Sequence, residues 1–182
     1  MLKWLMRRRV AAFEREWDYD MGYVRELLDA DLGAVLALSK VMAMADYRRG
    51  VPLAPWYAAK LVATMEADCG PCAQLVVAKA ERAGVGPAVI AALVRRDAAA
   101  MPEDVLLAFR FAERVLARDP EADSLREEVI RRWGRQGLAS LAFAITAGGL
   151  FPILKQGLGH ARACRRLTVA GQTLPVLREA AA

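Results

Sequence analysis

Apolar residues recur at the spacing of an α-helix through nearly every segment of the chain, and this periodicity limits the fold more than any other feature. The first segment sets the pattern with Leu2, Met6, Val10, Phe13 and Trp17. Gly and Pro residues separate the periodic segments, and the strong helix formers alanine and leucine dominate them. The sequence therefore predicts an all-α protein.

We expect the helices to end at the Gly and Pro residues, with one small hairpin near the C-terminus. Residues alternate between Leu167 and Val176 around Ala170-Gly171-Gln172, a pattern that predicts two short strands. The expected helices are Leu2–Trp17, Tyr23–Tyr47, Trp56–Glu66, Pro71–Gly84, Pro87–Arg95, Met101–Arg118, a segment from the Asp119-Pro120 turn to Trp133, and Gly137–Leu154.

The charge pattern argues against a nucleic-acid partner. The formal net charge is only +5, from 26 basic and 21 acidic residues, and the two signs are interspersed. One basic cluster, Lys3 with Arg7–Arg9, is followed at once by the acidic residues Glu14 and Glu16. A nucleic-acid footprint needs a basic face with a reading element, and neither is present. The first helix is expected to be an arm packed on the body or on a partner subunit, with a membrane-surface anchor as the alternative.

The uncharged segment Gly137–Leu154 is nearly long enough to span a bilayer. We expect it to be a buried helix instead, without stable membrane insertion, because it contains Gly, Ser, Thr and Pro residues and no second such segment exists. The hydrophobic fraction of 56% exceeds that of an average soluble domain, which reflects either alanine alone or a surface buried by self-association. Together with the apolar segment it predicts a homo-oligomer, a dimer, a trimer or a multiple of one. The basic N-terminus lacks the apolar stretch of a signal peptide, so a cytoplasmic location with reduced cysteines is expected.

The strongest chemical signal is the dithiol motif Cys69-Gly70-Pro71-Cys72 at the start of an expected helix. Amide donors and partial positive charge at a helix N-terminus stabilise a thiolate and lower the pKa of a cysteine there. A thiolate that attacks a peroxide becomes a sulfenic acid, which the second cysteine converts to a disulfide. A partner dithiol then reduces that disulfide by exchange.

The same four residues occur in thioredoxins, where the motif follows a β-strand. Here the preceding segment, Trp56–Glu66, is helical and rich in alanine, which excludes that fold. The stretches Tyr57–Gly84, Pro87-Ala88-Val89-Ile90 and Pro102–Leu116 resemble the carboxymuconolactone decarboxylase/alkylhydroperoxidase D (AhpD-like) family. The resemblance covers Val51 to Cys164 and implies an oligomeric all-helical bundle with its Cys-x-x-Cys at a helix start. Some members of that family are thiol peroxidases, and others are decarboxylases without the cysteine pair.

With this resemblance, the chain divides into N-terminal helices (1–50) that serve as an arm or in oligomer packing, an AhpD-like helical domain (51–166) and a C-terminal tail (167–182), all within one structural domain. Two residues depart from the family's peroxidase pattern. Val76 lies where that pattern has a histidine, four residues after the second cysteine, and Tyr57 lies where it has a glutamate, twelve residues before the first. The resemblance therefore carries over Cys69 and Cys72 alone.

Two other residues are candidates for the proton transfer that the missing histidine and glutamate would provide. Glu66 precedes Cys69 by three residues and could accept a thiol proton if burial raised its pKa; otherwise it is an exposed acid at a helix end. His160 is the only histidine, and in a helix it would share a face with Cys164. It is a proton carrier, a zinc ligand together with Cys164 and the Cys-x-x-Cys pair, or a structural histidine.

The leading hypothesis is an AhpD-like dithiol oxidoreductase that reduces a hydroperoxide, or exchanges with a protein disulfide, through Cys69 and Cys72. Cys69, Cys72, Glu66 and His160 are its candidate catalytic residues. It would need no cofactor or metal, a small-molecule substrate and a dithiol reductant of unknown identity. The alternatives are a non-redox relative that binds or transforms a small organic acid, and a zinc-stabilised interaction module.

Overall fold

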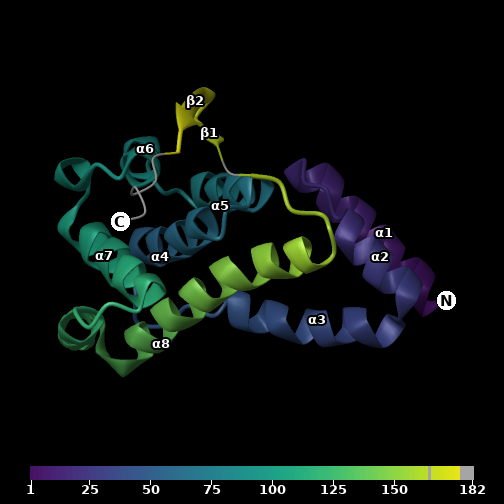
Figure 1. The fold of residues 1–182 in the computed structure, drawn as a ribbon, viewed down its shortest axis with the longest axis horizontal. Helices are drawn as coiled ribbons and strands as arrows, with labels where there is room; N and C mark the ends of the chain where they lie inside the picture. The colour runs from purple at the N-terminus through teal and green to yellow at the C-terminus, as the bar shows by residue number, and fades with distance from the viewer. Residues whose placement is uncertain (164, 177–182) are drawn as a thin grey trace.

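The computed structural model describes residues 1–163 and 165–176 and confirms the predicted all-α fold (Figure 1). Helices make up nearly all the regular structure of this part of the chain, and a single antiparallel hairpin follows them. The elements are α1 (Leu2–Trp17), α2 (Gly22–Ala30), α3 (Leu32–Ala45), α4 (Leu53–Glu66), α5 (Gly70–Arg82), α6 (Pro87–Arg95), the short 3₁₀ helix η1 (Ala98–Ala100), α7 (Glu103–Ala117), α8 (Ala122–Gly157), β1 (Arg166–Val169) and β2 (Gln172–Pro175).

The division of the chain into helices differs from the expected one at two places. The segment 23–47 forms two helices, because the Asp31 side chain accepts hydrogen bonds from the amides of Gly33 and Ala34 and so begins a new helix. The two helices expected on either side of residues 134–136 form one run, α8, which is interrupted by non-helical backbone at Gly134 (φ 68°, ψ −178°). The hairpin is confirmed, with Leu167 paired to Leu174 across it.

The main hydrophobic core surrounds α4, which packs against α5, α7 and α8. Helix α8 approaches α4 closely at Gly148, where an added Cβ would lie 2.6 Å from both the Ala63 Cβ and the Lys60 carbonyl oxygen. A glycine is therefore required at this crossing. Leu167, Val169 and Leu174 of the hairpin are buried in the same core, so residues 166–176 pack against the helices.

A second hydrophobic cluster joins the N-terminal helices to the rest of the molecule. Its buried members come from α1, α2, α3 and the α1–α2 connection, and Leu75 of α5 with Leu154 of α8 pack against them. In Figure 1, α1 and α2 lie at the end of the molecule marked N, and α3 runs from there alongside the C-terminal half of α8. The buried members are Val10, Tyr19, Tyr23, Val24, Leu28 and Val35.

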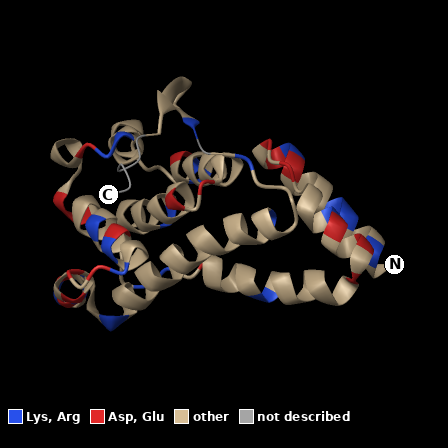
Figure 2. Ribbon diagram, in the orientation of Figure 1, with Lys and Arg blue, Asp and Glu red and all other residues tan. Residues whose placement is uncertain are grey.

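Charged residues avoid one part of the surface. Figure 2 shows α3 and the C-terminal half of α8 almost bare of charge, whereas α1 and α2 carry both signs. By length and composition α8 could cross a membrane, but 44% of its most apolar window is buried inside the protein. The core helix of a soluble protein has the same properties, so this helix alone is weak evidence for a membrane span.

Candidate active site

Cys69 and Cys72 lie at the N-terminus of α5, where the sequence placed them. The backbone reverses direction at Asp68, whose φ of 53° is left-handed, and Cys69 then occupies the N-cap position in an extended conformation. The Gly70 amide donates to the Arg162 carbonyl oxygen (2.9 Å), which ties this turn to the segment after α8. Pro71 is one of the first two residues of α5, where the missing amide donor costs no helical hydrogen bond, and the Cys69 side chain accepts no capping hydrogen bond.

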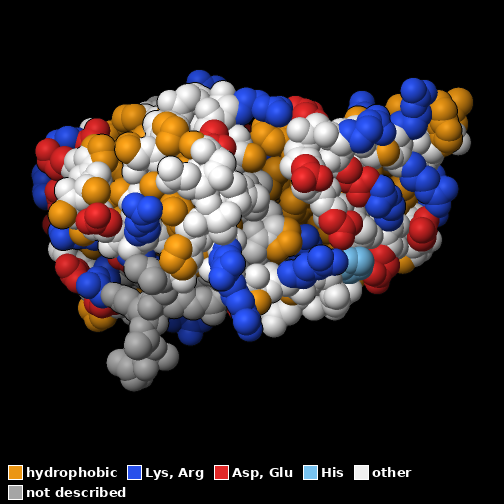
Figure 3. All heavy atoms as spheres, turned by 90° about the horizontal axis from the view of Figure 1, so that it is seen from above, with side chains coloured by type: hydrophobic (Ala, Val, Ile, Leu, Met, Phe, Trp, Pro, Cys, Tyr) orange, Lys and Arg blue, Asp and Glu red, His pale blue; other side chains and the backbone are white. Residues whose placement is uncertain are grey.

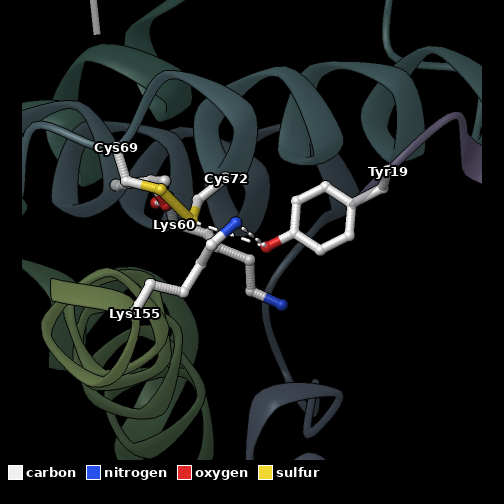
Figure 4. The surroundings of a disulfide bond; sticks show 6 residues. Tyr19, Lys60, Cys69, Cys72 and Lys155 are labelled. Carbon is white, nitrogen blue, oxygen red and sulfur yellow. Dashed lines mark hydrogen bonds between the residues drawn. A yellow bond between two sulfur atoms is a disulfide. The ribbon is translucent and has the colours of Figure 1, made fainter. Parts of the chain in front are cut away.

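The two cysteines form a disulfide in this structure, with their Cα atoms 5.2 Å apart (Figure 4). Cys69 is fully buried, and Cys72 is 5% exposed. Only Cys72 lines the cavity described below, so the two sulfurs have different access to a small molecule. Cys72 is therefore the sulfur that a small molecule in this cavity could contact, and Cys69 lies behind it.

A buried tyrosine and a buried lysine lie next to Cys72. The Tyr19 hydroxyl is 3.6 Å from the Cys72 Sγ, and the Lys155 Nζ donates to that hydroxyl at 3.3 Å (Figure 4). An ammonium group can only donate, so the Tyr19 oxygen accepts from Lys155. The Tyr19 proton has two neighbouring acceptors, the Cys72 sulfur and the Tyr23 hydroxyl. Three distant parts of the chain thus meet at one sulfur atom, namely the α1–α2 connection, α5 and α8.

Burial tunes both of these groups. It raises the pKa of Tyr19, which therefore stays protonated and remains a hydrogen-bond donor at neutral pH. Burial also lowers the pKa of Lys155, an effect that the nearby Asp20 carboxylate opposes. The Lys155 ammonium lies 4.6 Å from the centre of the Tyr19 ring, a cation–π distance, which compensates part of its lost hydration.

A cavity of about 460 Å³ opens beside Cys72, between the N-terminal helices and the rest of the molecule. Viewed from above, hydrophobic side chains are visible in the recess between these two parts (Figure 3). Lys60 also lines the cavity; its Nζ donates to the Ala45 carbonyl oxygen and lies 3.7 Å from the centre of the Trp56 ring. Burial lowers the pKa of Lys60 to about 8. Apolar lining residues include Val10, Phe13, Val24, Val35, Leu75 and Phe151.

Glu66 and His160, the other two predicted site residues, lie apart from this arrangement. Glu66 is 44% exposed and forms an ion pair with Arg96, which also pairs with Glu113. His160 follows the end of α8 in non-helical backbone, and its Nε2 lies 2.7 Å from the Glu26 Oε2. Neither residue lines the cavity beside Cys72.

The part of the chain that the structure describes contains no cluster of side chains suited to a metal ion. There, no group of three or more His, Cys, Asp or Glu side chains is arranged to hold a metal ion. Cys164, the fourth ligand in the predicted zinc set, lies outside the described residues. His160 is not in a helix, whereas the helix face that it was expected to share with Cys164 required it to be helical.

Tyr19 and Lys155 were missed from the sequence. Lys155 did leave a signal, because it is the one charged residue between Gly137 and the end of α8, and a charge on so apolar a helix needs a partner. Tyr19 follows the predicted first helix without any motif. Val76, at the position of the family's histidine, does line the cavity, but it cannot transfer a proton.

No family model matches the chain, and no curated protein or solved structure matches it either. The AhpD-like resemblance therefore stays a prediction that rests on the Cys-Gly-Pro-Cys motif and its helical surroundings. The chemistry open to Cys69 and Cys72 has to follow from the groups around them.

Proposed function

We propose that this protein is an AhpD-like dithiol oxidoreductase that reduces an organic hydroperoxide through Cys72 and Cys69. The observation that carries the proposal is the contact of the Cys72 Sγ with the buried Tyr19 hydroxyl, itself hydrogen-bonded to the Lys155 ammonium. A nearby positive charge and a hydrogen-bond donor both favour a thiolate. They also supply the proton that peroxide cleavage consumes.

In the first step the Cys72 thiolate attacks the terminal oxygen of the hydroperoxide. A sulfur–oxygen bond forms and the oxygen–oxygen bond breaks, so Cys72 is oxidised to a sulfenic acid and an alkoxide leaves. The alkoxide takes a proton from the Tyr19 hydroxyl, and Lys155 returns a proton to Tyr19, which leaves an alcohol as the product. General acid catalysis of this kind contributes roughly 10²–10⁴-fold to a rate.

In the second step the Cys69 sulfur attacks the Cys72 sulfenic acid. A disulfide forms, and hydroxide leaves and combines with the Cys69 proton to give water. An external dithiol small enough to enter the cavity then reduces the disulfide by exchange, and it returns two electrons and two protons while its own two thiols become a disulfide. Overall, a hydroperoxide and a dithiol become an alcohol, water and a disulfide.

Burial of both sulfurs favours a small-molecule oxidant over a protein disulfide. Cys69 is fully buried and Cys72 is 5% exposed, so a disulfide on a protein surface cannot approach either sulfur without local opening. The cavity, in contrast, reaches Cys72 directly. A hydroperoxide that fits the cavity can therefore meet the thiolate in the folded protein.

The test is to add one equivalent of cumene hydroperoxide to the reduced protein, in a Cys164→Ser background, and to count thiols by mass spectrometry. We expect loss of both thiols with wild-type Cys69 and Cys72, a trapped sulfenic acid in Cys69→Ser, and no reaction in Cys72→Ser. Glu66→Gln should change the rate less than Lys155→Met, because Glu66 is paired with Arg96. The proposal fails if Cys69 and Cys72 remain reduced.

The non-redox alternative, a protein that binds a small organic acid, has one observation in its favour, namely the basic side chains Arg9, Lys60 and Lys79 of the cavity wall. If this alternative is right, the Cys69→Ser/Cys72→Ser variant keeps the protein's function, since binding of an organic acid needs neither thiol. If the dithiol proposal is right, the same variant loses the function completely, since it cannot reduce a hydroperoxide.

We also propose that the chain forms a homo-oligomer through α3 and α8. A shallow groove between these helices is lined only by uncharged apolar residues, among them Val41 and Leu150. Ile153, in the same groove, has 67% of its surface exposed in the isolated chain. Uncharged apolar surface of this kind marks an interaction site.

A further inference from the structure

We propose that the cavity beside Cys72 binds an amphiphilic carboxylate, with the carboxylate group on Lys60 and the hydrocarbon chain along the apolar wall. As an extension that rests on the proposed function, the oxidant would be the hydroperoxide of such an organic acid. The binding of the carboxylate itself needs no redox chemistry.

The size of the cavity is the first observation. Its volume of about 460 Å³ lies in the range of roughly 300–1,000 Å³ that is usual for pockets that bind organic ligands. One water molecule occupies about 30 Å³ of liquid, and hydrogen peroxide is not much larger. A site built for hydrogen peroxide alone would not need an apolar recess of this size.

The polar groups of the cavity wall are the second observation. The hydroxyl of Thr64 donates to the Lys60 carbonyl oxygen (2.7 Å), and that of Ser39 donates to the Leu36 carbonyl oxygen (2.7 Å). Both hydroxyls therefore donate their protons to carbonyl oxygens of their own helices. Among the basic side chains of the wall, Lys60 has an ammonium group with three donors and can bind a polar head.

The charge balance is the third observation. No carboxylate among the described residues forms an ion pair with Lys60, and its hydrogen bond to the Ala45 carbonyl oxygen uses one of its three protons. Asp46 is the one acidic residue on the cavity wall, and its negative charge already acts favourably on the Lys60 ammonium, but Arg9 and Lys79 add further positive charge. An incoming carboxylate would thus relieve an excess of positive charge in a largely apolar site.

The Lys60 and Cys72 side chains are arranged so that one ligand can reach both. Both line the same cavity, and Figure 4 shows Lys60 extending past the Tyr19 hydroxyl, away from Cys69. A carboxylate on Lys60 would leave the chain of the ligand free to run along the apolar wall. A peroxide group on that chain could then reach the Cys72 sulfur.

The experiment measures binding alone. Isothermal titration calorimetry with decanoate and with 1-decanol is done on the full chain carrying Cys69→Ser and Cys72→Ser, so that no thiol reacts. Lys60→Met removes a charge-assisted hydrogen bond to the carboxylate, which is stronger than one to a neutral hydroxyl. We therefore expect Lys60→Met to weaken decanoate binding at least tenfold and decanol binding less than threefold.

Two further variants serve as controls. Lys60→Arg keeps the positive charge and should retain the preference for decanoate over decanol. Lys40→Met removes an exposed lysine from α3 and should leave decanoate binding unchanged. The inference is overturned if decanoate does not bind saturably, or if Lys60→Met weakens both ligands equally.

The two proposals can fail separately. If decanoate binds through Lys60 but cumene hydroperoxide leaves the Cys72 thiol untouched, the redox function is wrong and the carboxylate site stands. If the thiols are oxidised but Lys60→Met does not change decanoate binding, the redox function stands and the carboxylate site is wrong.

Discussion

Replacing Lys155 by methionine tests whether the buried ammonium group activates Cys72. The Lys155 Nζ lies 3.3 Å from the Tyr19 hydroxyl, which lies 3.6 Å from the Cys72 Sγ, so the ammonium is no more than about 7 Å from the sulfur. At an effective dielectric constant of about 20, two unit charges at this distance attract by about 2 kcal/mol. One pKa unit corresponds to about 1.4 kcal/mol. We therefore expect Lys155→Met to raise the pKa of the Cys72 thiol by roughly one to two units.

The assay follows the rate of alkylation of Cys72 by iodoacetamide as a function of pH. It uses a chain with Cys69→Ser and Cys164→Ser, so that Cys72 is the one cysteine left. Only the thiolate reacts, so the midpoint of the pH profile reports its pKa. Methionine fills much of the volume of a buried lysine and removes a desolvated charge, so the variant should fold.

Lys79→Met is the matched control for the loss of one positive charge. Lys79 also lines the cavity, but its ammonium lies over the Phe13 and Trp17 rings and makes no hydrogen bond to Tyr19. We expect the pKa of Cys72 to move less in this variant than in Lys155→Met. Equal shifts in the two variants, or no shift in Lys155→Met, would refute the role assigned to Lys155.

Three further predictions concern stability and assembly. Gly148→Ala should lower the free energy of unfolding by roughly 1–3 kcal/mol, because its Cβ would meet the neighbouring helix, whereas Gly149→Ala, which has open space, should raise it by up to about 1 kcal/mol; urea titration of both checks this. Lys60 has a pKa of about 8 when folded and 10.5 as its ordinary value, so between these pH values the unfolded chain binds more protons and stability rises with pH. Relative to Lys60→Met, the wild type should gain up to about 3 kcal/mol over that interval in urea titrations, and a flat difference would contradict the assignment. Ile153→Glu should dissociate the proposed oligomer in light scattering, and an unchanged mass, or a wild type that is already monomeric, would contradict the α3–α8 interface.

The sequence by itself determined the helices, the hairpin and the place of the dithiol. These features depend on neighbours within a few positions, such as the apolar spacing along α1 or the turn at Ala170-Gly171, where both residues adopt a positive φ. Even the missed boundary at Asp31 is local, because its side chain accepts hydrogen bonds from the amides of Gly33 and Ala34, two and three residues further along. Local chemistry of this kind can be read without knowing the fold.

Only the tertiary structure decided which side chains surround the dithiol. Tyr19 lies 53 positions from Cys72 and 136 positions from Lys155, and the three meet because the N-terminal helices pack against α5 and α8. Glu66, only three residues from Cys69, pairs instead with Arg96 on the surface. Nearness in the sequence does not fix the direction of a side chain at a helix end, whereas the packing of one buried cluster on another brings distant residues to the same sulfur atom.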